Sequence, residues 1–295
     1  MKQHIKLNFT DFWPGFNKFD NYFYNLLQKF YDIEISDEPD FLICSCFGKE
    51  YKRFNCITIF YAGEVFYRDK KVKLDFNLYD YIFSFDYIAS PDNYRLPLYA
   101  WFFSYELERK EDVDFDRLLS EKTGFCNFVY SNGKAKKRVE FFHKLSKYKK
   151  VDSGGRYLNN IGGSVMDKLE FIKKYKFTIA FENCSYPGYT TEKLVEPFFA
   201  YSLPIYWGNP LVHRDFNTQC FLNAHEFKSE EALIERIIEI DNNDELYLNY
   251  LRKPCFYGNK INQFIRYENV LDQFSYIFNH AKMPVAKSRK KLLFY

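Results

Sequence analysis

The amino-acid sequence predicts an α/β protein made of two Rossmann-like domains. Short apolar runs recur along the chain, and segments with apolar residues at helical spacing separate them. The runs are apolar on both faces, as expected for parallel strands that helices cover on either side. The chain has 295 residues, of which 47% are hydrophobic and 21% aromatic, so it has enough apolar material for one large or two medium-sized domains.

The first domain is expected over residues 1–115. FDNYFYNLLQKFY (19–31) has the apolar spacing of a helix, and four segments have the pattern of buried strands: HIKLNF (4–9), DFLICSCF (40–47), CITIFYAGE (56–64) and YDYIFSFDYIA (79–89). From residue 106 to residue 122 the sequence becomes strongly charged and helical in pattern. We therefore place the domain boundary in this stretch.

The second domain is expected over residues 116–275 and repeats the α/β alternation. Strands are expected in GFCNFVYSN (124–132), VDSGGRY (151–157), KFTIAFEN (176–183) and LPIYWG (203–208). Helices are expected in KAKKRVEFFHKLSKY (134–148), DKLEFIKKY (167–175), TTEKLVEPFFAY (190–201) and SEEALIERIIEID (229–241). Open parallel sheets bind ligands outside the carboxyl ends of their strands, so two such domains in tandem predict a ligand held in a cleft between them.

Composition narrows the class of protein. A net charge of +3 and a pI near 8.3 are too mild to single out nucleic acid as a partner. The sequence has no run of eighteen or more apolar residues, and its N-terminus lacks the apolar core of a signal peptide, so we expect a cytoplasmic protein. Seven cysteines with one close pair, Cys44 and Cys46, fit neither a disulfide framework nor a zinc site and are expected to be reduced and mostly buried.

The segment FENCSYPGYTTEKLVEPFF (181–199) carries the strongest local signal. It has the pattern of a strand, a tight loop and a helix, in which Gly188 permits the turn and Thr190 or Thr191 caps the helix. Free backbone N–H groups at such a helix start bind anions. The helix dipole disfavours a cation such as Lys193 in the first turn of a helix, and a phosphate bound nearby would explain a lysine at this position. An ordinary solvated helix start with Glu192 and Lys193 at its surface is the alternative.

The wider sequence resembles glycosyltransferase family 10, the α1,3/α1,4-fucosyltransferases. YKFTIAFENCSYPGYTTEKLVEPFFAYSLPIYWGNP (175–210) matches the family's Phe-Glu-Asn strand end, Gly-Tyr-x-Thr-Glu-Lys helix start and Pro-x-Tyr-Trp-Gly strand. FVYSNGKAKKRVEFFHKL (128–145) resembles its Val-x-Ser-Asn segment with a downstream Arg. Residues 60–88, DFWPGF (11–16) and RLPLY (95–99) resemble bacterial members, so that the resemblance covers roughly residues 5 to 280.

The resemblance implies a GT-B type fold and an inverting reaction. GDP-β-L-fucose would be held mainly by the C-terminal domain, and L-fucose would pass to the 3-OH or 4-OH of N-acetylglucosamine in a lactosamine-type glycan. A Lewis-antigen-like structure in a bacterial surface polysaccharide would result. The resemblance implies no required cofactor or metal, and it leaves open whether Mn²⁺ or Mg²⁺ stimulates turnover and whether α1,3 or α1,4 linkage is preferred.

The resemblance also implies roles for residues of the donor site. Arg138 and Lys193 match the cations that stabilise the charge on the departing diphosphate. Glu192 matches a donor-binding position and could favour positive charge on the sugar ring. The remaining candidates for donor binding are Ser131, Asn132, Asn183 and Tyr189.

The general base is expected in the N-terminal domain, where the acceptor hydroxyl must lose its proton. Glu64 matches the Glu of the family's Tyr-Thr-Gly-Glu pattern and follows an apolar strand. Some bacterial members have a Glu directly after their Phe-Asp pair, where this chain has Tyr87. Glu64 is therefore the first choice for the base and Asp86 the second.

Other features of the sequence indicate no catalytic chemistry. The Asp-x-Asp in EDVD (111–114) resembles a metal motif but is expected at the surface, and we assign no chemistry to His143, His213 or His225. The basic tail, residues 276–295, suits weak docking to an anionic membrane at the cytoplasmic face or is disordered. The alternatives for function are a glycosyltransferase with another nucleotide-sugar donor or a glucose-type acceptor, and a non-enzymatic binder of polyanions.

Overall fold

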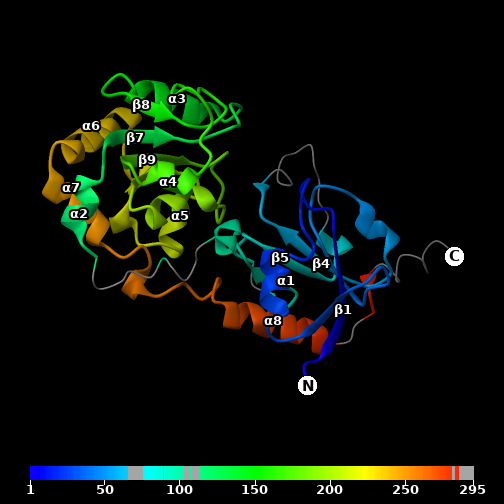
Figure 1. Ribbon diagram of the computed structural model, residues 1–295. Coiled ribbons are helices and arrows are strands. Elements are labelled where there is room, and N and C mark those ends of the chain that lie inside the picture. Colours follow the sequence, from blue (N-terminus) through cyan, green and yellow to red (C-terminus); the bar gives the residue numbers. More distant parts are fainter. Residues whose placement is uncertain (66–75, 89, 103–106, 108–112, 281–282, 286–295) are drawn as a thin grey trace. The chain divides into compact units, whose positions relative to one another are not determined.

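The computed structural model confirms the predicted α/β fold (Figure 1). It describes residues 1–65, 76–88, 90–102, 107, 113–280 and 283–285. The chain divides into two compact units: unit 1 comprises Met1–Pro97 and Gln263–Tyr295, and unit 2 comprises Leu98–Asn262. Each unit has its own parallel sheet.

Unit 1 contains a six-stranded parallel sheet in the order β2-β1-β3-β4-β5-β6. Its strands are β1 (His4–Thr10), β2 (Asp32–Ile35), β3 (Phe41–Cys44), β4 (Ile57–Ala62), β5 (Tyr81–Ser84) and β6 (Asn93–Arg95). The helices are α1 (Tyr22–Leu27), α8 (Tyr267–Asn279) and the 3₁₀ helices η1 (Glu50–Arg53) and η3 (Phe76–Leu78). Every residue of β3 and β4 is buried, which is why these strands are apolar on both faces.

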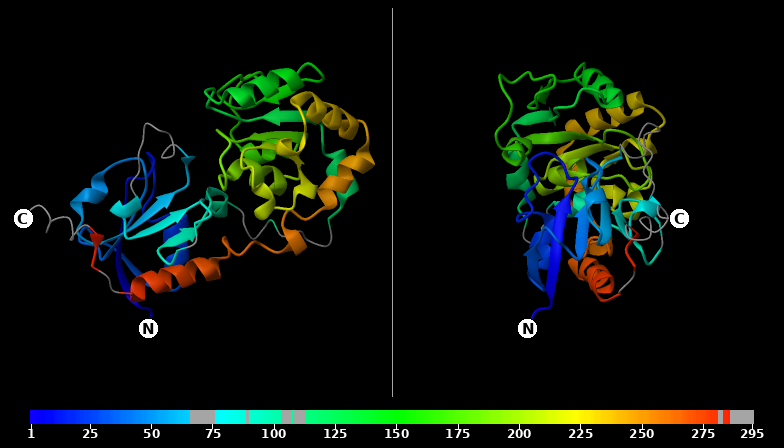
Figure 2. Two further views of the ribbon diagram at one scale, coloured as in Figure 1. Left: turned by 180° about the vertical axis from the view of Figure 1, so that it is seen from behind. Right: turned by 90° about the vertical axis from the view of Figure 1, so that its right-hand side faces the viewer.

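Helix α8 comes from the far end of the chain and packs on the sheet of unit 1 beside α1 (Figure 2). The Phe274 ring lies 5.8 Å from the Phe23 ring of α1 and 4.9 Å from the Phe83 ring of β5. The Phe278 ring lies 4.7 Å from that of Phe41. The apolar face of α8 therefore completes the core of unit 1.

Unit 2 contains a five-stranded parallel sheet in the order β11-β10-β9-β7-β8. Its strands are β7 (Gly124–Phe128), β8 (Val151–Ser153), β9 (Tyr175–Phe181), β10 (Leu203–Trp207) and β11 (Leu222–Asn223). The α-helices are α2 (Phe115–Ser120), α3 (Lys136–Leu145), α4 (Lys168–Ile172), α5 (Glu192–Phe199), α6 (Glu230–Asp241) and α7 (Asp244–Arg252). Short 3₁₀ helices are η4 (Leu98–Trp101), η5 (Val212–Arg214), η6 (Thr218–Cys220), η7 (Ala224–Glu226) and η8 (Tyr257–Asn259).

Helices cover both faces of the unit 2 sheet. One core unites Phe177, Ile179 and Phe181 of β9 with apolar residues of α3, α6 and α7. Helices α4 and α5 also contact β9, but their residues are not part of this core. Side chains alternate between the two faces along a strand, so the residue after Phe181, Glu182, points toward α5. This alternation positions the site described below.

The structure differs in part from the expected domain organisation. The chain enters unit 2 at Leu98, before the charged stretch in which we placed the boundary at 115–116. It returns to unit 1 at Gln263, so α8, most of which was assigned to the domain ending at residue 275, belongs to the first sheet. Helical periodicity shows that a segment has an apolar face, but it does not show which sheet that face covers.

Two features named from the sequence, the EDVD segment and the basic tail, lie partly outside the described residues. Asp114 caps α2 by accepting a hydrogen bond from the Arg117 N–H at 2.9 Å, whereas residues 111–112 of the EDVD segment lie outside the described residues. So does most of the basic tail, residues 281–282 and 286–295. Among the described helices, none is both long and apolar enough to cross a membrane.

Candidate active site

The sheet of unit 2 has a topological switch point between β7 and β9. These two strands are neighbours, and the chain leaves β7 toward β8 on one side and continues from β9 toward β10 on the other. Ligands of open α/β sheets bind where the strand order reverses in this way, outside the carboxyl ends of the strands. Ser131 and Asn132 follow β7, and Glu182 and Asn183 follow β9.

Arg138, in the first turn of α3, joins the two strand ends. One guanidinium nitrogen, Nη2, donates to the Asn132 carbonyl at 2.8 Å. The other, Nη1, donates to the Phe181 carbonyl at 3.2 Å and to Asn183 Oδ1 at 3.3 Å. The guanidinium carbon lies 3.9 Å from the centre of the Tyr130 ring. Three predicted site residues, Asn132, Arg138 and Asn183, are thus brought together.

The Arg138 side chain is 0% exposed, and no carboxylate among the described residues forms a direct ion pair with it. Within the part of the chain that the structure describes, the acceptors of its hydrogen bonds are neutral and its Nε has no hydrogen-bond partner. Burying a cation without an anion is costly. The switch point of unit 2 therefore contains a buried guanidinium without a direct anionic partner, which suits an anionic ligand.

The loop after β9 turns into α5 as the sequence predicts. Gly188 has a φ of +85°, in the left-handed region that favours glycine, and its N–H donates to Asn209 Oδ1 at 2.8 Å. Of the two candidate caps, the residue at the N-cap is Thr191, whose hydroxyl accepts from the Lys193 N–H at 3.4 Å. Both threonines are fully buried, and the Thr190 hydroxyl instead accepts from Asn209 Nδ2 at 3.2 Å.

Lys193 lies between two carboxylates. Its Nζ is 3.0 Å from Glu192 Oε1 and 3.4 Å from Glu182 Oε2, and it donates to Thr191 Oγ1 at 2.9 Å. The Lys193 side chain is 12% exposed and that of Glu192 is 24% exposed, whereas Glu182 is completely buried. The alternative of a solvated helix start does not describe this arrangement, because the three charged groups pack against one another.

The three groups have displaced pKa values. Burial raises the pKa of Glu182 to about 7, although the Lys193 ammonium acts in the opposite direction. Burial also opposes ionisation of Glu192, but the ammonium groups of Lys193 and Lys168 outweigh it and lower its pKa to about 2. Burial acts to lower the pKa of Lys193, and the two carboxylates together raise it above its usual value. Glu192 is therefore ionised at neutral pH, whereas Glu182 titrates near it.

The remaining donor-site candidates lie around this centre. Ser131 and Asn132 are exposed, Ser131 Oγ accepts from Arg156 Nε at 3.4 Å, and Asn132 Oδ1 accepts from the Lys134 N–H at 2.9 Å. Tyr189 is fully buried, and its carbonyl accepts from the Tyr206 hydroxyl at 3.4 Å. Tyr189 is thus part of the packing under the loop in this structure.

The two candidates for the general base lie in unit 1. Glu64 follows β4 and is half-buried, and Asp86 follows β5 and is 7% exposed. Since β4 and β5 are adjacent parallel strands, both carboxylates lie at the same edge of the sheet. Asp86 Oδ2 accepts from Ser84 Oγ at 3.2 Å. Tyr87, which replaces the Glu of some bacterial members, has its ring 4.2 Å from the Arg95 guanidinium.

Glu182 is the functional candidate that the sequence interpretation missed. Its position at the end of the buried strand KFTIAFEN was a usable signal, because a carboxylate directly after an apolar strand lies at the ligand-binding edge. The pattern alone did not show that its side chain turns under the α5 helix start.

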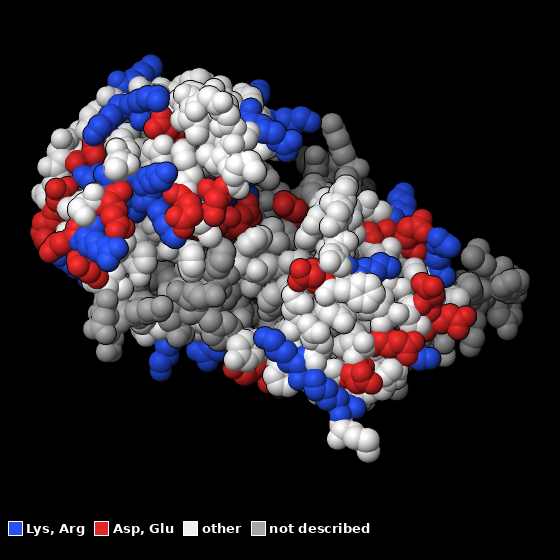
Figure 3. Space-filling view, in the orientation of Figure 1, with Lys and Arg blue, Asp and Glu red and all other residues white. Residues whose placement is uncertain are grey.

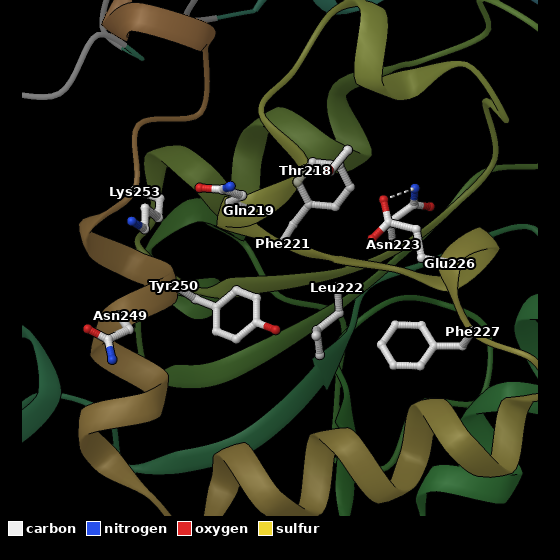
Figure 4. A pocket seen from close by; sticks show the side chains of 10 residues that line it. All are labelled: Thr218, Gln219, Phe221, Leu222, Asn223, Glu226, Phe227, Asn249, Tyr250 and Lys253. Carbon is white, nitrogen blue, oxygen red and sulfur yellow. Dashed lines mark hydrogen bonds between the residues drawn. The ribbon is translucent and has the colours of Figure 1, made fainter.

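Unit 2 has another cavity, of about 330 Å³, bordered by η6, β11, η7 and α7 (Figure 4). Tyr250 and Phe227 contribute rings to its wall, and Asn223 donates to Glu226 at 3.1 Å. Its lining contains none of the residues predicted for the donor site. Across the described residues, no group of three or more His, Cys, Asp or Glu side chains is arranged to hold a metal ion.

The fold and this site define a GT-B type α/β protein with a cationic site at the switch point of its second unit. The chain belongs to glycosyltransferase family 10, the fucosyltransferases. The family model described as "Glycosyltransferase family 10 (fucosyltransferase) C-term" matches residues 119–277, and that described as "Alpha-(1,3)-fucosyltransferase FucT N-terminal domain" matches residues 7–102. The resemblance noted in the sequence is thereby confirmed.

Individual proteins are similar over much of the chain. An α-(1,3)-fucosyltransferase FucT of Helicobacter pylori is 31% identical over 261 residues, which are 77% of this chain and 55% of that protein. A putative fucosyltransferase of Acanthamoeba polyphaga mimivirus is 33% identical over 54% of this chain and 28% of its own length. The chain thus spans about half the length, or less, of these curated relatives.

Solved structures agree with the fold. A crystal structure of an α1,3-fucosyltransferase with GDP-fucose is 25% identical and has a TM-score of 0.78, with 96% of this chain and 94% of that chain covered. A structure described as that of α1,3-fucosyltransferase alone gives a TM-score of 0.82 at 25% identity, with 96% and 92% covered.

Proposed function

We propose that this protein is an inverting fucosyltransferase that uses GDP-β-L-fucose. L-Fucose passes to the 3-OH or 4-OH of N-acetylglucosamine in a lactosamine-type glycan, and the product is a Lewis-type structure. Membership of glycosyltransferase family 10 supports the reaction class, and the similarity to an α1,3-fucosyltransferase structure with GDP-fucose supports the donor.

The observation that carries this proposal is the buried guanidinium of Arg138 at the switch point of unit 2, whose described hydrogen-bond partners are all neutral. A diphosphate bound there would supply the missing negative charge and would accept hydrogen bonds from an electropositive site. The same cation would stabilise the charge that develops on GDP as the bond to fucose breaks. An uncharged ligand would leave the buried cation without compensation.

Lys193 and Glu192 extend the donor site. The Lys193 ammonium contributes a second positive charge for the diphosphate, and its partner carboxylates fix its position. Glu192, with its pKa lowered to about 2, remains ionised throughout the neutral range. A fixed negative charge of this kind favours positive charge on the fucose ring in the transition state. Ser131, Asn132, Asn183 and Tyr189 complete the proposed donor site.

The acceptor hydroxyl loses its proton to a carboxylate of unit 1. Glu64 is the first choice and Asp86 the second, since both stand at the carboxyl edge of that sheet. In one displacement, the acceptor oxygen bonds to C1 of fucose, the bond from C1 to the diphosphate breaks, and the proton passes to the carboxylate. GDP leaves with the bonding electron pair, and the configuration at C1 inverts.

Fucose transfer to N-acetyllactosamine and to lacto-N-biose, with a chelator present, tests the proposal. Arg138→Met should lose about 100-fold in GDP-fucose affinity, as expected when charge-assisted hydrogen bonds are lost. Lys136→Met is the matched control, because it removes an exposed charge from the same helix and should change affinity less than about twofold. Glu64→Gln should keep donor binding and lose turnover.

Three other results would change the proposal. Unchanged GDP-fucose affinity in Arg138→Met would remove the observation on which it rests. Full turnover in Glu64→Gln, together with loss in Asp86→Asn, would move the base to Asp86. Turnover that appears only when Mn²⁺ or Mg²⁺ replaces the chelator would add a metal requirement.

The two alternative functions predict different measurements. A transferase with another donor would be inhibited by that nucleotide sugar more strongly than by GDP-fucose. A polyanion binder would show steep salt dependence and no donor turnover. On the face drawn in Figure 3, Lys and Arg are mixed with Asp and Glu over the lower part of unit 2, whereas its upper part shows mainly Lys and Arg.

A further inference from the structure

Glu182 makes a dense set of hydrogen bonds beneath the start of α5. Its Oε1 accepts from the Thr191 N–H at 2.8 Å, and the Thr191 hydroxyl lies 3.0 Å from Oε1 and 2.9 Å from Oε2. The Glu182 N–H continues the pairing of β9 with β10 by donating to the Trp207 carbonyl at 2.7 Å. The carboxylate therefore connects the end of the strand to the N-cap of the helix.

The neighbouring backbone leaves room for this side chain. A Cβ added to Gly208, which follows β10, would lie 2.4 Å from Glu182 Cγ and 2.8 Å from Glu182 Cβ. The same atom would lie 2.8 Å from the Tyr206 hydroxyl. A side chain at position 208 would therefore displace Glu182, so Gly208 helps to form the space that the carboxylate occupies.

Glu182 shares its nearest described cation, Lys193, with a second carboxylate. From α5, the Lys193 ammonium lies 3.4 Å from Glu182, but it lies closer, at 3.0 Å, to Glu192. The other groups acting on Glu182 or its neighbours are Tyr130 beyond β7, Tyr206 of β10, Arg138 of α3 over the Tyr130 ring and Lys168 of α4. The Lys193 ammonium is thus shared by two carboxylates. The buried one, Glu182, has the longer contact, whereas Glu192 is also stabilised by Lys168.

We propose that Glu182 is a positioning residue of the donor site, which fixes Thr191 and the Lys193 ammonium and takes up a proton from solvent when a diphosphate binds. This inference rests on the proposed function of Lys193. A bound diphosphate adds negative charge beside Glu182 and competes for the ammonium, and both effects favour the neutral carboxyl. The protonated carboxyl still accepts from the Thr191 N–H, so the helix start keeps its support.

The affinity for GDP-fucose should depend on pH, because binding and protonation of Glu182 favour each other. Burial already raises the pKa of Glu182 to about 7 in the free protein, and donor binding should raise it further. Between the two values the free protein is deprotonated and the complex is protonated, so binding takes up a proton. GDP-fucose affinity should then fall as the pH rises above about 7, by up to about tenfold per pH unit.

Calorimetric titration of the full chain with GDP-fucose, without acceptor, tests the proposal. Both phosphates of this donor are esterified, so the diphosphate does not itself titrate near neutral pH. Wild type should show a Kd that rises about three- to tenfold from about pH 7 to about pH 8. Its binding heat should also depend on the ionisation enthalpy of the buffer, with up to about one proton taken up.

Glu182→Gln mimics the protonated carboxyl and keeps an acceptor for Thr191. Its Kd should match that of wild type at about pH 6, stay constant to about pH 8, and show no buffer dependence. Glu196→Gln is the matched control. Glu196 lies in α5, and burial raises its pKa as it does that of Glu182, but its partner is Lys168. This variant should keep the wild-type pH slope.

Each other outcome counts against the proposal in a different way. If the wild-type Kd does not change with pH and the binding heat does not depend on the buffer, no proton is taken up and the proposal is wrong. This test uses the wild type alone, so it does not require Glu182→Gln to fold. A wild-type slope that persists in Glu182→Gln but disappears in Glu196→Gln assigns the proton to Glu196. Absence of GDP-fucose binding in wild type at every pH refutes the proposed function itself.

Discussion

Lys193 occupies the first turn of α5, where the dipole of a helix disfavours a cation. Three oxygen atoms, from Glu182, Thr191 and Glu192, lie within 3.4 Å of its ammonium and offset that unfavourable position. Two of the three residues are neighbours in the sequence, whereas Glu182 comes from the preceding strand. The cation is therefore held by tertiary structure, and its charge is available at a fixed place.

Gly188 offers a test of the loop geometry at the level of one residue. An alanine there would have to adopt a φ near +85°, at a cost of roughly 1–2 kcal/mol, and would strain the hydrogen bond to Asn209. We expect Gly188→Ala to lower the melting temperature and to weaken GDP-fucose binding by at least about tenfold. Thermal unfolding and calorimetry provide the two measurements.

Gly162→Ala is the control for backbone strain alone. Gly162 has a similar φ of +87° in the same unit, and a Cβ there would meet nothing within 4 Å. This variant should lose similar stability and keep its donor affinity. If both variants bound GDP-fucose as wild type does, the loop would have no part in donor binding.

The sequence predicts the local backbone of the candidate site, because turns and helix caps depend on neighbouring residues. Gly188 and the cap at Thr191 follow from local backbone chemistry and are confirmed. The burial of Arg138 does not follow from KAKKR, which reads as a solvated basic run. It depends on Tyr130 and on two strand ends that only the folded chain brings beside α3.

Among the elements, α8 has the clearest structural role. Phe274 and Ile277 are completely buried, although the helix is separated from the rest of unit 1 by the whole of unit 2 in sequence. We expect Phe274→Ala to destabilise the protein by about 3–5 kcal/mol, as is typical for loss of a buried ring. Chemical denaturation monitored by circular dichroism measures this change.

Asp272→Ala is the control in the same helix. Asp272 is exposed, so its replacement should change the free energy of unfolding by less than about 0.5 kcal/mol. An equal effect of the two variants would mean that α8 contributes through helix formation alone and not through the Phe274 contacts with Phe23 and Phe83.

Buried strands are the elements that the sequence predicts most clearly. Strands β3, β4 and β9 are almost entirely buried and were expected within a few residues of their bounds. Strand β2 alternates between exposed and half-buried residues, and β6 and β11 have only three and two residues. Short or partly exposed strands at the edge of a sheet have weak apolar patterns, so these were missed.

At the scale of the whole molecule, unit 1 is built from two segments that are far apart in the sequence. Unit 1 is completed by residues after Gln263, and unit 2 is continuous from Leu98 to Asn262. The apolar contacts of α8 with β3 and β5 therefore join residues more than 180 positions apart. Unit 1 depends on the end of the chain, whereas the segment that forms unit 2 contains its own sheet and helices.

This arrangement predicts opposite effects of two truncations. A chain that ends at His280 keeps α8 and should retain protected amides in β1–β6. A chain that ends at Asn262 loses the rings that cover Phe23, Phe41 and Phe83, so those amides should exchange rapidly while the amides of β7, β9 and β10 stay protected. GDP-fucose should still bind the shorter chain if the donor site belongs to unit 2 alone. Hydrogen exchange and calorimetry are measured on both chains. Protected β1–β6 amides in the shorter chain would show that unit 1 does not need α8. Loss of GDP-fucose binding by the shorter chain would show that donor binding needs unit 1.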